Sequence, residues 1–122
     1  MSVKEVRALC GKEMIIGVSA KTLEQAKSAE SEGADYLGVG AVFSTTTKSN
    51  AKEISHDTLK EIAKSVNIPI VAIGGINKNN ILKLSGSGIC GVALVSAIFA
   101  SRDIEKECKI LKELSYKAVH ND

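Results

Sequence analysis

Apolar residues gather in short segments of the chain that show little polar alternation. These segments are Met14–Val18, Tyr36–Phe43, Ile68–Ile73 and Ile89–Val95, and they are rich in valine, isoleucine and glycine. Continuous apolar runs of this length are typical of strands buried on both faces, as in a parallel sheet that is covered by helices. The pattern therefore predicts a parallel sheet with one strand for each segment.

The stretches around the first predicted strand have the spacing and the caps of helices. A leading helix is expected over Ser2–Cys10. After the strand, Thr22 and Gln25 have the spacing of a capping box, and Gly33 stands where the helix that they open would end. Each helix would cover one face of the sheet.

Three further helices are expected in the second half of the chain. Ser55 opens the first, Asn77 caps a shorter one, and the last is amphipathic, with Glu105 and Lys109 paired on its solvent side. The faces that would pack on the sheet are Leu59, Ile62, Ala63 and Val66 in the first of these helices and Ile104, Cys108, Leu111 and Leu114 in the last. Helices thus alternate with strands along the whole chain.

A leading helix followed by strand–helix units implies right-handed crossovers and an α/β fold with an all-parallel sheet. We expect a single domain over residues 1–122, built as a (β/α)4 half of a TIM (β/α)8 barrel. A closed barrel usually needs roughly 200 residues or more, so an open four-stranded sheet is the alternative. Either sheet has two free edges, which predicts self-association, and a dimer would complete an eight-stranded barrel.

The composition argues against several classes of function. A net charge of +2 arises from 16 basic and 14 acidic residues that alternate along the chain, so no general field for nucleic acid is expected. Aromatic residues make up 3% of the chain, too few for a base-stacking platform. Cys10, Cys90 and Cys108 form no CxxC pair and predict neither disulfides nor zinc, and Cys90 is expected to be a packing residue. No export or membrane segment is evident, which predicts a cytoplasmic protein.

Two glycine-containing or hydroxyl-containing turns follow the last two predicted strands. Gly74 and Gly75 lead from a strand into a helix, so their backbone N–H groups can face an anion. Val95 and Ser96 hold the same position after the next strand, and in barrels the last two loops often share one phosphate site. Either motif alone could be only a tight structural turn. The two motifs in this order favour a phosphate-binding site.

Other polar residues near predicted strand ends are less specific. Thr45, Thr46, Thr47 and Lys48 offer hydroxyls and an ammonium that suit phosphate oxygens, although such a run is also typical of a solvated loop. Ser19 ends the first strand, where a lone serine is most often a cap or turn residue. His56 and His120 have no partner at triad or metal spacing, which favours structural roles.

Several segments together resemble the second half of the thiamine phosphate synthase family. They are residues 15–19, 33–43, 45–48, 71–76 and 95–99, in the family's order and spacing. The resemblance implies a transferase that joins a pyrimidine methyl diphosphate to a thiazole phosphate, giving thiamine phosphate and pyrophosphate with Mg²⁺. It implies that Ser19 and Lys48 contact the pyrimidine diphosphate, and that both act in catalysis. The residues implied around the thiazole phosphate are Thr45, Thr46, Thr47, Gly75, Val95 and Ser96.

The chain also departs from the family pattern. The family's first four strands are absent, and with them the aspartates that hold Mg²⁺, so no metal ligand is expected here. Asp35 precedes a strand, at the wrong end of a barrel for this role. Three alternatives stay open: a catalytically silent phosphate-binding fragment, one half of a split enzyme, and a relative of the thiazole tautomerases, which carry a histidine near the position of Ala41.

Overall fold

Helices and strands alternate along the chain after a leading helix. The structure, a computed structural model, describes residues 2–43, 54–94, 96–99 and 101–120. The elements are α1 (Val3–Cys10), β1 (Gly17–Ala20), α2 (Leu23–Ser31), β2 (Tyr36–Val39), α3 (His56–Ser65), β3 (Ile70–Ile73), a 3-10 helix η1 (Ile81–Leu84), β4 (Gly91–Ala93), α4 (Ser96–Phe99) and α5 (Ile104–His120).

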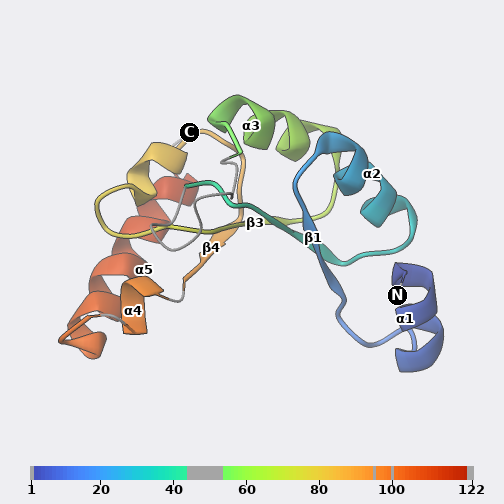
Figure 1. Cartoon of the computed structure of the whole chain (residues 1–122), viewed down its shortest axis with the longest axis horizontal. Coiled ribbons are helices and arrows are strands. Elements are labelled where there is room, and N and C mark those ends of the chain that lie inside the picture. The colour runs from blue at the N-terminus through green and yellow to red at the C-terminus, as the bar shows by residue number, and fades with distance from the viewer. Residues whose placement is uncertain (1, 44–53, 95, 100, 121–122) are drawn as a thin grey trace.

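The strands form one parallel sheet in the order β1-β2-β3-β4. The helices lie around the outside of the curved sheet, and no described element covers its concave face (Figure 1). The predicted α/β fold, with a parallel half-barrel and a leading helix, is confirmed. Because the strands are parallel, all their carboxyl ends meet at one edge of the sheet.

The hydrophobic core lies between the convex face of the sheet and the helices. Strand residues alternate between buried positions that face the helices and more exposed positions on the concave face. The largest side chains that are almost fully buried are Leu37, Val39, Leu59, Ile62, Ile70, Ile81 and Leu111. Burial of this kind contributes roughly 25 cal/mol for each Å² of apolar surface removed from water. The sheet is therefore stabilised mainly from one side.

Side-chain caps begin the helices where the sequence predicts them. Ser2 Oγ accepts from the Glu5 N–H at 3.2 Å, and Thr22 Oγ1 accepts from the Gln25 N–H at 3.1 Å. Ser55 Oγ accepts from Thr58 in the same way at 3.1 Å. Each such cap contributes about 1 kcal/mol to helix stability.

The first strand begins later than the sequence predicts. Residues 14–18 were expected to form it, but β1 runs from Gly17 to Ala20, and the side chains of Met14 and Ile15 are 52% and 74% exposed. The cause is a set of side-chain hydrogen bonds to the preceding loop. Arg7 donates to the Met14 carbonyl, and Asp35 accepts from the Ile16 N–H. These backbone groups are therefore not available to a strand ladder.

Two further predictions about packing are wrong. Cys90 is exposed, because it precedes the edge strand β4 and only its backbone joins the sheet, with its N–H donating to the Ile70 carbonyl at 2.8 Å. Ile104 and Cys108 are also exposed, whereas Leu111 and Ala118 are buried. The helix α5 has 17 residues and β4 has three, so at about 1.5 Å per helical residue the first turns of α5 extend beyond the strand.

Candidate functional site

The loop after β3 lies directly against the backbone that follows β2. Gly74 and Gly75 have φ angles of 101° and 65°, in the left-handed region that favours glycine. A Cβ at Gly75 would stand 2.6 Å from the Phe43 carbonyl oxygen, and one at Gly74 would stand 2.7 Å from the Ala41 Cα. Glycine is therefore required at both positions by conformation and by space.

Backbone hydrogen bonds hold these two loops together. The Val42 N–H donates to the Ile73 carbonyl at 3.0 Å, and the Phe43 N–H donates to the Gly74 carbonyl at 3.2 Å. Beyond the gap in the description, the Ile54 N–H donates to the Ala41 carbonyl at 2.7 Å. The described residues on both sides of segment 44–53 thus lie at the glycine loop.

Four of the predicted site residues belong to that segment. They are Thr45, Thr46, Thr47 and Lys48, and they lie outside the described residues. Their predicted contacts with phosphate stay predictions.

The Asn80 side chain fixes the glycine loop, a role that our sequence analysis missed. Its amide Nδ2 donates to the Gly75 carbonyl at 2.9 Å, and its Oδ1 accepts from the Asn77 N–H at 2.8 Å. The run Asn77–Asn80 was the available signal, because asparagines tie their side chains to nearby backbone in turns.

The same contacts correct the prediction for Asn77. Its Oδ1 accepts from the Asn79 N–H at 2.8 Å, so it forms a turn, and the short helix that follows is a 3-10 helix that begins only at Ile81. No helix therefore starts at the glycine pair. Among the described residues, the N–H groups of Gly74, Gly75 and Ile76 have no hydrogen-bond acceptor, and N–H groups of successive residues in such a turn are the donors that bind anions in proteins.

The second predicted phosphate-binding turn is at the same edge of the sheet. Ile73 pairs with Ala93 in register, and Gly75 and Ser96 follow this pair in the sequence by two and three residues. Ser96 is the first residue of α4, and Val95 lies outside the described residues. The topology thus brings the backbone of Ser96 to the edge that carries Gly75, as the sequence predicts.

Ser19 lies on the concave face of the sheet, within β1. It pairs with Gly38 and its side chain is exposed. It also borders a hollow of about 550 Å³ on this face, together with Tyr36 and Val71. Ser19 is therefore accessible to a ligand, close to the edge where Gly75 and Ser96 lie.

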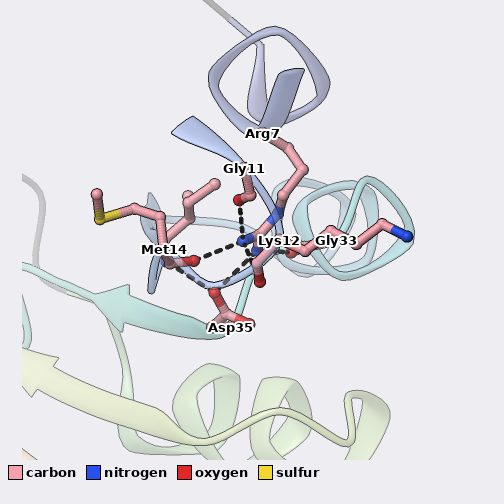
Figure 2. Close-up of polar contacts among 7 residues, drawn as sticks. Arg7, Gly11, Lys12, Met14, Gly33 and Asp35 are labelled. Carbon is pink, nitrogen blue, oxygen red and sulfur yellow. Dashed lines mark hydrogen bonds and ion pairs between the residues drawn. The ribbon is translucent and has the colours of Figure 1, made fainter. Parts of the chain in front are cut away.

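Asp35 is engaged at the opposite edge of the sheet (Figure 2). Its Oδ2 accepts from Arg7 Nη2 at 2.9 Å and from the Ile16 N–H at 2.8 Å. The same guanidinium also donates to the carbonyls of Gly11, Lys12, Met14 and Gly33. This Arg7–Asp35 cluster ties α1 to the starts of β1 and β2, which confirms that Asp35 lies at the end of the sheet opposite the predicted site.

The described residues do not fit the Mg²⁺ that the resemblance implies. Within residues 2–43, 54–94, 96–99 and 101–120, no three His, Cys, Asp or Glu side chains are grouped so that they could hold a metal ion. Asp35 is already paired with Arg7. Ligands for Mg²⁺ would therefore have to come from residues beyond these ranges.

We expect the Arg7–Asp35 cluster to make stability depend on acid. The Arg7 guanidinium, followed by the Ile16 N–H, lowers the pKa of Asp35 below its ordinary value of 3.8. A carboxyl whose pKa is lower in the folded state stabilises the fold above its unfolded pKa, and this contribution is lost as the pH falls through the folded pKa. Asp35→Asn should lower the melting temperature at pH 7, and its melting temperature should fall less steeply than the parent's below pH 4.

The control for this measurement is Glu105→Gln, which removes the exposed Glu105–Lys109 pair at 3.4 Å on α5. Exposed pairs of this kind contribute about 0–1 kcal/mol, so its melting curve should follow the parent's at every pH. Parallel curves for Asp35→Asn and the parent between pH 7 and pH 2 would contradict the assigned role of Asp35.

The remaining candidate groups have structural contacts. The His56 Nε2 lies 3.2 Å from the Ser85 carbonyl, and His120 stacks on Tyr116 with a centroid separation of 4.0 Å. Cys10, Cys90 and Cys108 are free thiols. Among the helices that the structure describes, none is both long and apolar enough to cross a membrane.

Comparison with known proteins identifies the sequence family. The family described as thiamine monophosphate synthase matches residues 1–98. A thiamine-phosphate synthase of Clostridium tetani is 53% identical over 106 residues, which are 87% of this chain and 51% of the relative. A thiamine-phosphate synthase of Methanococcus maripaludis is 51% identical over 106 residues, with the same coverage of 87% and 51%.

Solved structures share the fold. The thiamine phosphate pyrophosphorylase from Pyrococcus furiosus superposes with a TM-score of 0.88 at 38% identity, covering 98% of this chain and 56% of that one. The corresponding enzyme from Bacteroides thetaiotaomicron gives a TM-score of 0.68 at 20% identity, covering 91% of this chain and 57% of that one. The chain therefore spans about half the length of the curated relatives that it matches.

Proposed function

The chain belongs to the thiamine monophosphate synthase family, and from this premise we propose that it supplies the phosphate-binding half of a thiamine phosphate synthase site. The observation that carries the proposal is the glycine loop after β3. Gly74 and Gly75 are held against Ala41 and Phe43, and no described residue accepts their N–H groups. Such a loop provides N–H donors for phosphate oxygens without an opposing charge.

The substrates in this proposal are a thiazole phosphate and a pyrimidine methyl diphosphate. The thiazole phosphate is bound by Gly75, Val95 and Ser96 at the carboxyl edge of β3 and β4. The hydroxyls of Thr45, Thr46 and Thr47 complete its site. The position of Gly75 and Ser96 beyond the Ile73–Ala93 pair supports a single shared site.

The diphosphate in this proposal is bound by Ser19 and Lys48. The bond between the pyrimidine methylene carbon and the diphosphate oxygen breaks, and its electron pair leaves with pyrophosphate. The thiazole nitrogen then attacks the methylene carbon and forms the new C–N bond. Lys48 stabilises the negative charge that grows on the departing pyrophosphate, which is electrostatic catalysis rather than proton transfer.

The complete site requires groups beyond the described residues. The described residues provide no group of carboxylates for Mg²⁺, so ligands for an ion that shares the charge of the pyrophosphate would have to come from a second half-barrel, beside the small phosphorylated substrates. That half is a second copy or a complementary (β/α)4 unit, and we place the assembly in the cytoplasm, with no nucleic acid or membrane partner.

The second candidate function is a phosphate-binding fragment without catalysis. It is supported by the contrast between the formed glycine loop and the lack of a metal-binding group among the described residues. A tautomerase function is less well supported, because Ala41, which lies against Gly74, carries no ionisable group. A synthase half should show turnover when a second half-barrel is added, whereas a phosphate-binding fragment without catalysis should not.

We expect Gly75→Val to abolish binding of thiazole phosphate, with affinity reduced at least about 100-fold, as expected when two or more N–H donors to a charged group are lost. The new Cβ would stand 2.6 Å from the Phe43 carbonyl oxygen, so the loop must move away from its present position. Isothermal titration calorimetry of both proteins with thiazole phosphate, and with inorganic phosphate, measures the loss.

The matched control is Gly86→Val. Gly86 also has a left-handed φ, of 77°, but a Cβ there meets nothing within 4 Å, and the residue follows η1 rather than β3. Gly86→Val therefore introduces the same kind of backbone strain as Gly75→Val, but no clash with Phe43 in the glycine loop. Equal affinities in Gly75→Val and the parent would place the phosphate elsewhere.

A further inference from the structure

The turn that follows the glycine loop is held from two sides. On one side, Asn80 Nδ2 donates to the Gly75 carbonyl at 2.9 Å, and Asn80 Oδ1 accepts from the Asn77 N–H at 2.8 Å. On the other side, Lys78 Nζ donates to Glu107 Oε1 at 3.2 Å. Glu107 belongs to α5 and stands 29 positions beyond Lys78 in the chain. The turn thus connects the glycine loop to a distant helix.

The contact from Asn80 sets the direction of a peptide group. A trans peptide group is planar, and its C=O and N–H point in opposite directions. Because Asn80 holds the Gly75 carbonyl, the Ile76 N–H of the same peptide group points away from Asn80. Among the described residues this N–H has no acceptor, and Ile76 itself is buried. A donor that is already held in one direction loses little freedom when an anion binds to it.

The carboxylate of Glu107 is shielded from water. Its side chain is 14% exposed, whereas the side chain of Glu105 on the same helix is 83% exposed. A charged group that has lost most of its water depends on its ionic partner, and a fully exposed pair holds its partner only weakly. The pair of Glu107 with Lys78 therefore restrains the turn more firmly than the pair of Glu105 with Lys109 restrains anything on the surface.

Helix α5 is also connected to α4, which begins at Ser96. The two helices pack side by side (Figure 1). The Ser101 N–H donates to the Ile98 carbonyl of α4 at 3.1 Å, and Ser101 Oγ accepts from the Asp103 N–H at 3.2 Å. The Asp103 carbonyl in turn accepts from the Glu107 N–H at 3.0 Å. A continuous series of hydrogen bonds therefore joins α4 to Glu107.

We propose that Glu107 and Asn80 are positioning residues for phosphate binding. Asn80 directs the Ile76 N–H toward the phosphate, and Glu107, through Lys78, fixes the glycine loop relative to α4. In this proposal neither side chain contacts the phosphate, and each acts through another group. The inference rests on the proposed function for the identity of the ligand, a phosphate that is bound by both loops.

Replacement of Glu107 tests the proposal by the sign of its effect. Loss of a negative charge would by itself strengthen the binding of an anion. A positioning role predicts the opposite, because the turn loses its connection to α5. In isothermal titration calorimetry, we expect Glu107→Ala to bind inorganic phosphate and thiazole phosphate about three-fold or more weakly than the parent. Glu107→Gln can still accept from Lys78 and should recover most of the affinity.

The control for the charge is Glu105→Ala. It removes the same charge from the same helix, at a position where the pair with Lys109 is exposed. Its affinity for phosphate should equal or exceed that of the parent. Affinity in Glu107→Ala that equals or exceeds that of the parent would overturn the role of Glu107, and circular dichroism shows that each variant is folded.

Asn80→Asp tests the direction of the peptide group. Aspartate has the shape of asparagine and can still accept from the Asn77 N–H, but it has no donor for the Gly75 carbonyl. The two oxygens repel each other, so the peptide group must turn and carry the Ile76 N–H with it. We expect phosphate affinity to fall at least about ten-fold. In ¹⁵N NMR spectra, the Ile76 amide signal should shift with added inorganic phosphate in the parent and not in the variant.

The control for the new charge is Asn79→Asp. The Asn79 side chain is exposed, and among the described residues only its backbone N–H takes part in the turn, where it donates to Asn77 Oδ1 at 2.8 Å. This variant adds the same charge one position away and leaves the Gly75 carbonyl bound to Asn80. Equal losses of affinity in Asn79→Asp and Asn80→Asp would assign the effect to charge and overturn the role of Asn80.

A failure of the proposed function gives a different result. Suppose that the parent binds inorganic phosphate but not thiazole phosphate, and that Glu107→Ala and Asn80→Asp weaken the binding of inorganic phosphate. This result would refute the proposed substrate and support the positioning residues. Equal binding of thiazole phosphate by the parent and by both variants would refute the positioning residues alone. A parent that binds neither probe would refute both proposals.

Discussion

The 122-residue chain alone is expected to release pyrophosphate no faster than the substrates do in buffer without protein, although it contains Lys48 and the glycine loop. Departure of pyrophosphate develops more negative charge than one ammonium can balance, and the described residues provide no metal-binding group to share it. The assay supplies the thiazole phosphate, the pyrimidine diphosphate and Mg²⁺, and it measures pyrophosphate with a coupled enzyme. Turnover by the lone chain would refute our account of what it lacks.

Adding a complementary half is expected to restore turnover only if that half brings carboxylates at the strand ends. In the restored assembly, Lys48→Ala should lower kcat by about 10²–10³-fold, the range seen when one preorganised group that stabilises transition-state charge is removed. Its effect on thiazole phosphate binding should be much smaller, because Lys48 acts on the other substrate. If Lys48→Ala left the kcat of the restored assembly unchanged, other groups would stabilise the charge on the departing pyrophosphate.

The order of the elements could be predicted from the sequence because it depends on local signals. The apolar segments that contain Leu37 and Ile70 are continuous, as strands covered by helices require, and the caps at Thr22 and Ser55 involve residues only three positions apart. Such signals do not depend on the rest of the fold. The parallel sheet then follows from the alternation of strands and helices.

The structure differs from the sequence prediction where side-chain hydrogen bonds hold backbone groups that a strand or a helix would otherwise use. The start of β1 is set by Arg7 and Asp35, which are 28 positions apart and show no shared spacing that would reveal their pairing. The start of η1 is set by the Asn80 side chain, which holds Gly75 and Asn77 in a turn. At the site, the glycine pair could be found from its place after a strand, whereas its contact with Phe43 required the fold.

The largest expected loss of stability comes from Gly40→Val, at the point where the chain leaves β2. A Cβ at Gly40 would stand 2.1 Å from the Ile73 carbonyl oxygen and 2.7 Å from the Ile73 Cγ2. The same carbonyl accepts the Val42 N–H at 3.0 Å. The valine must therefore displace a backbone group that joins the two loops of the site, and no change of rotamer relieves the clash.

The size of the effect follows from the kind of atom that must move. Overpacking in a well-packed interior costs about 1–3 kcal/mol, and occasionally more. Since a carbonyl is less free to move than a side-chain end, we expect about 3 kcal/mol or more. With an unfolding entropy of about 2.1 cal/mol/K per residue, each kcal/mol lowers the melting temperature of this 122-residue chain by about 4 °C. Thermal unfolding followed by circular dichroism should therefore show a decrease of at least about 12 °C, or no folded protein at all.

Gly38→Val provides the matched comparison, two residues earlier in the same part of the chain. Gly38 is within β2 and, unlike Gly40, has no atom within 4 Å of an added Cβ. Glycine in a strand costs about 0.5–1 kcal/mol relative to alanine, so Gly38→Val should leave the melting temperature unchanged or raise it by a few degrees. Because both variants add the same side chain, the difference between them isolates the contact with Ile73. Equal melting temperatures would mean that β2 and β3 do not approach each other as described, and the glycine loop would then lose the support that places it at the proposed phosphate site.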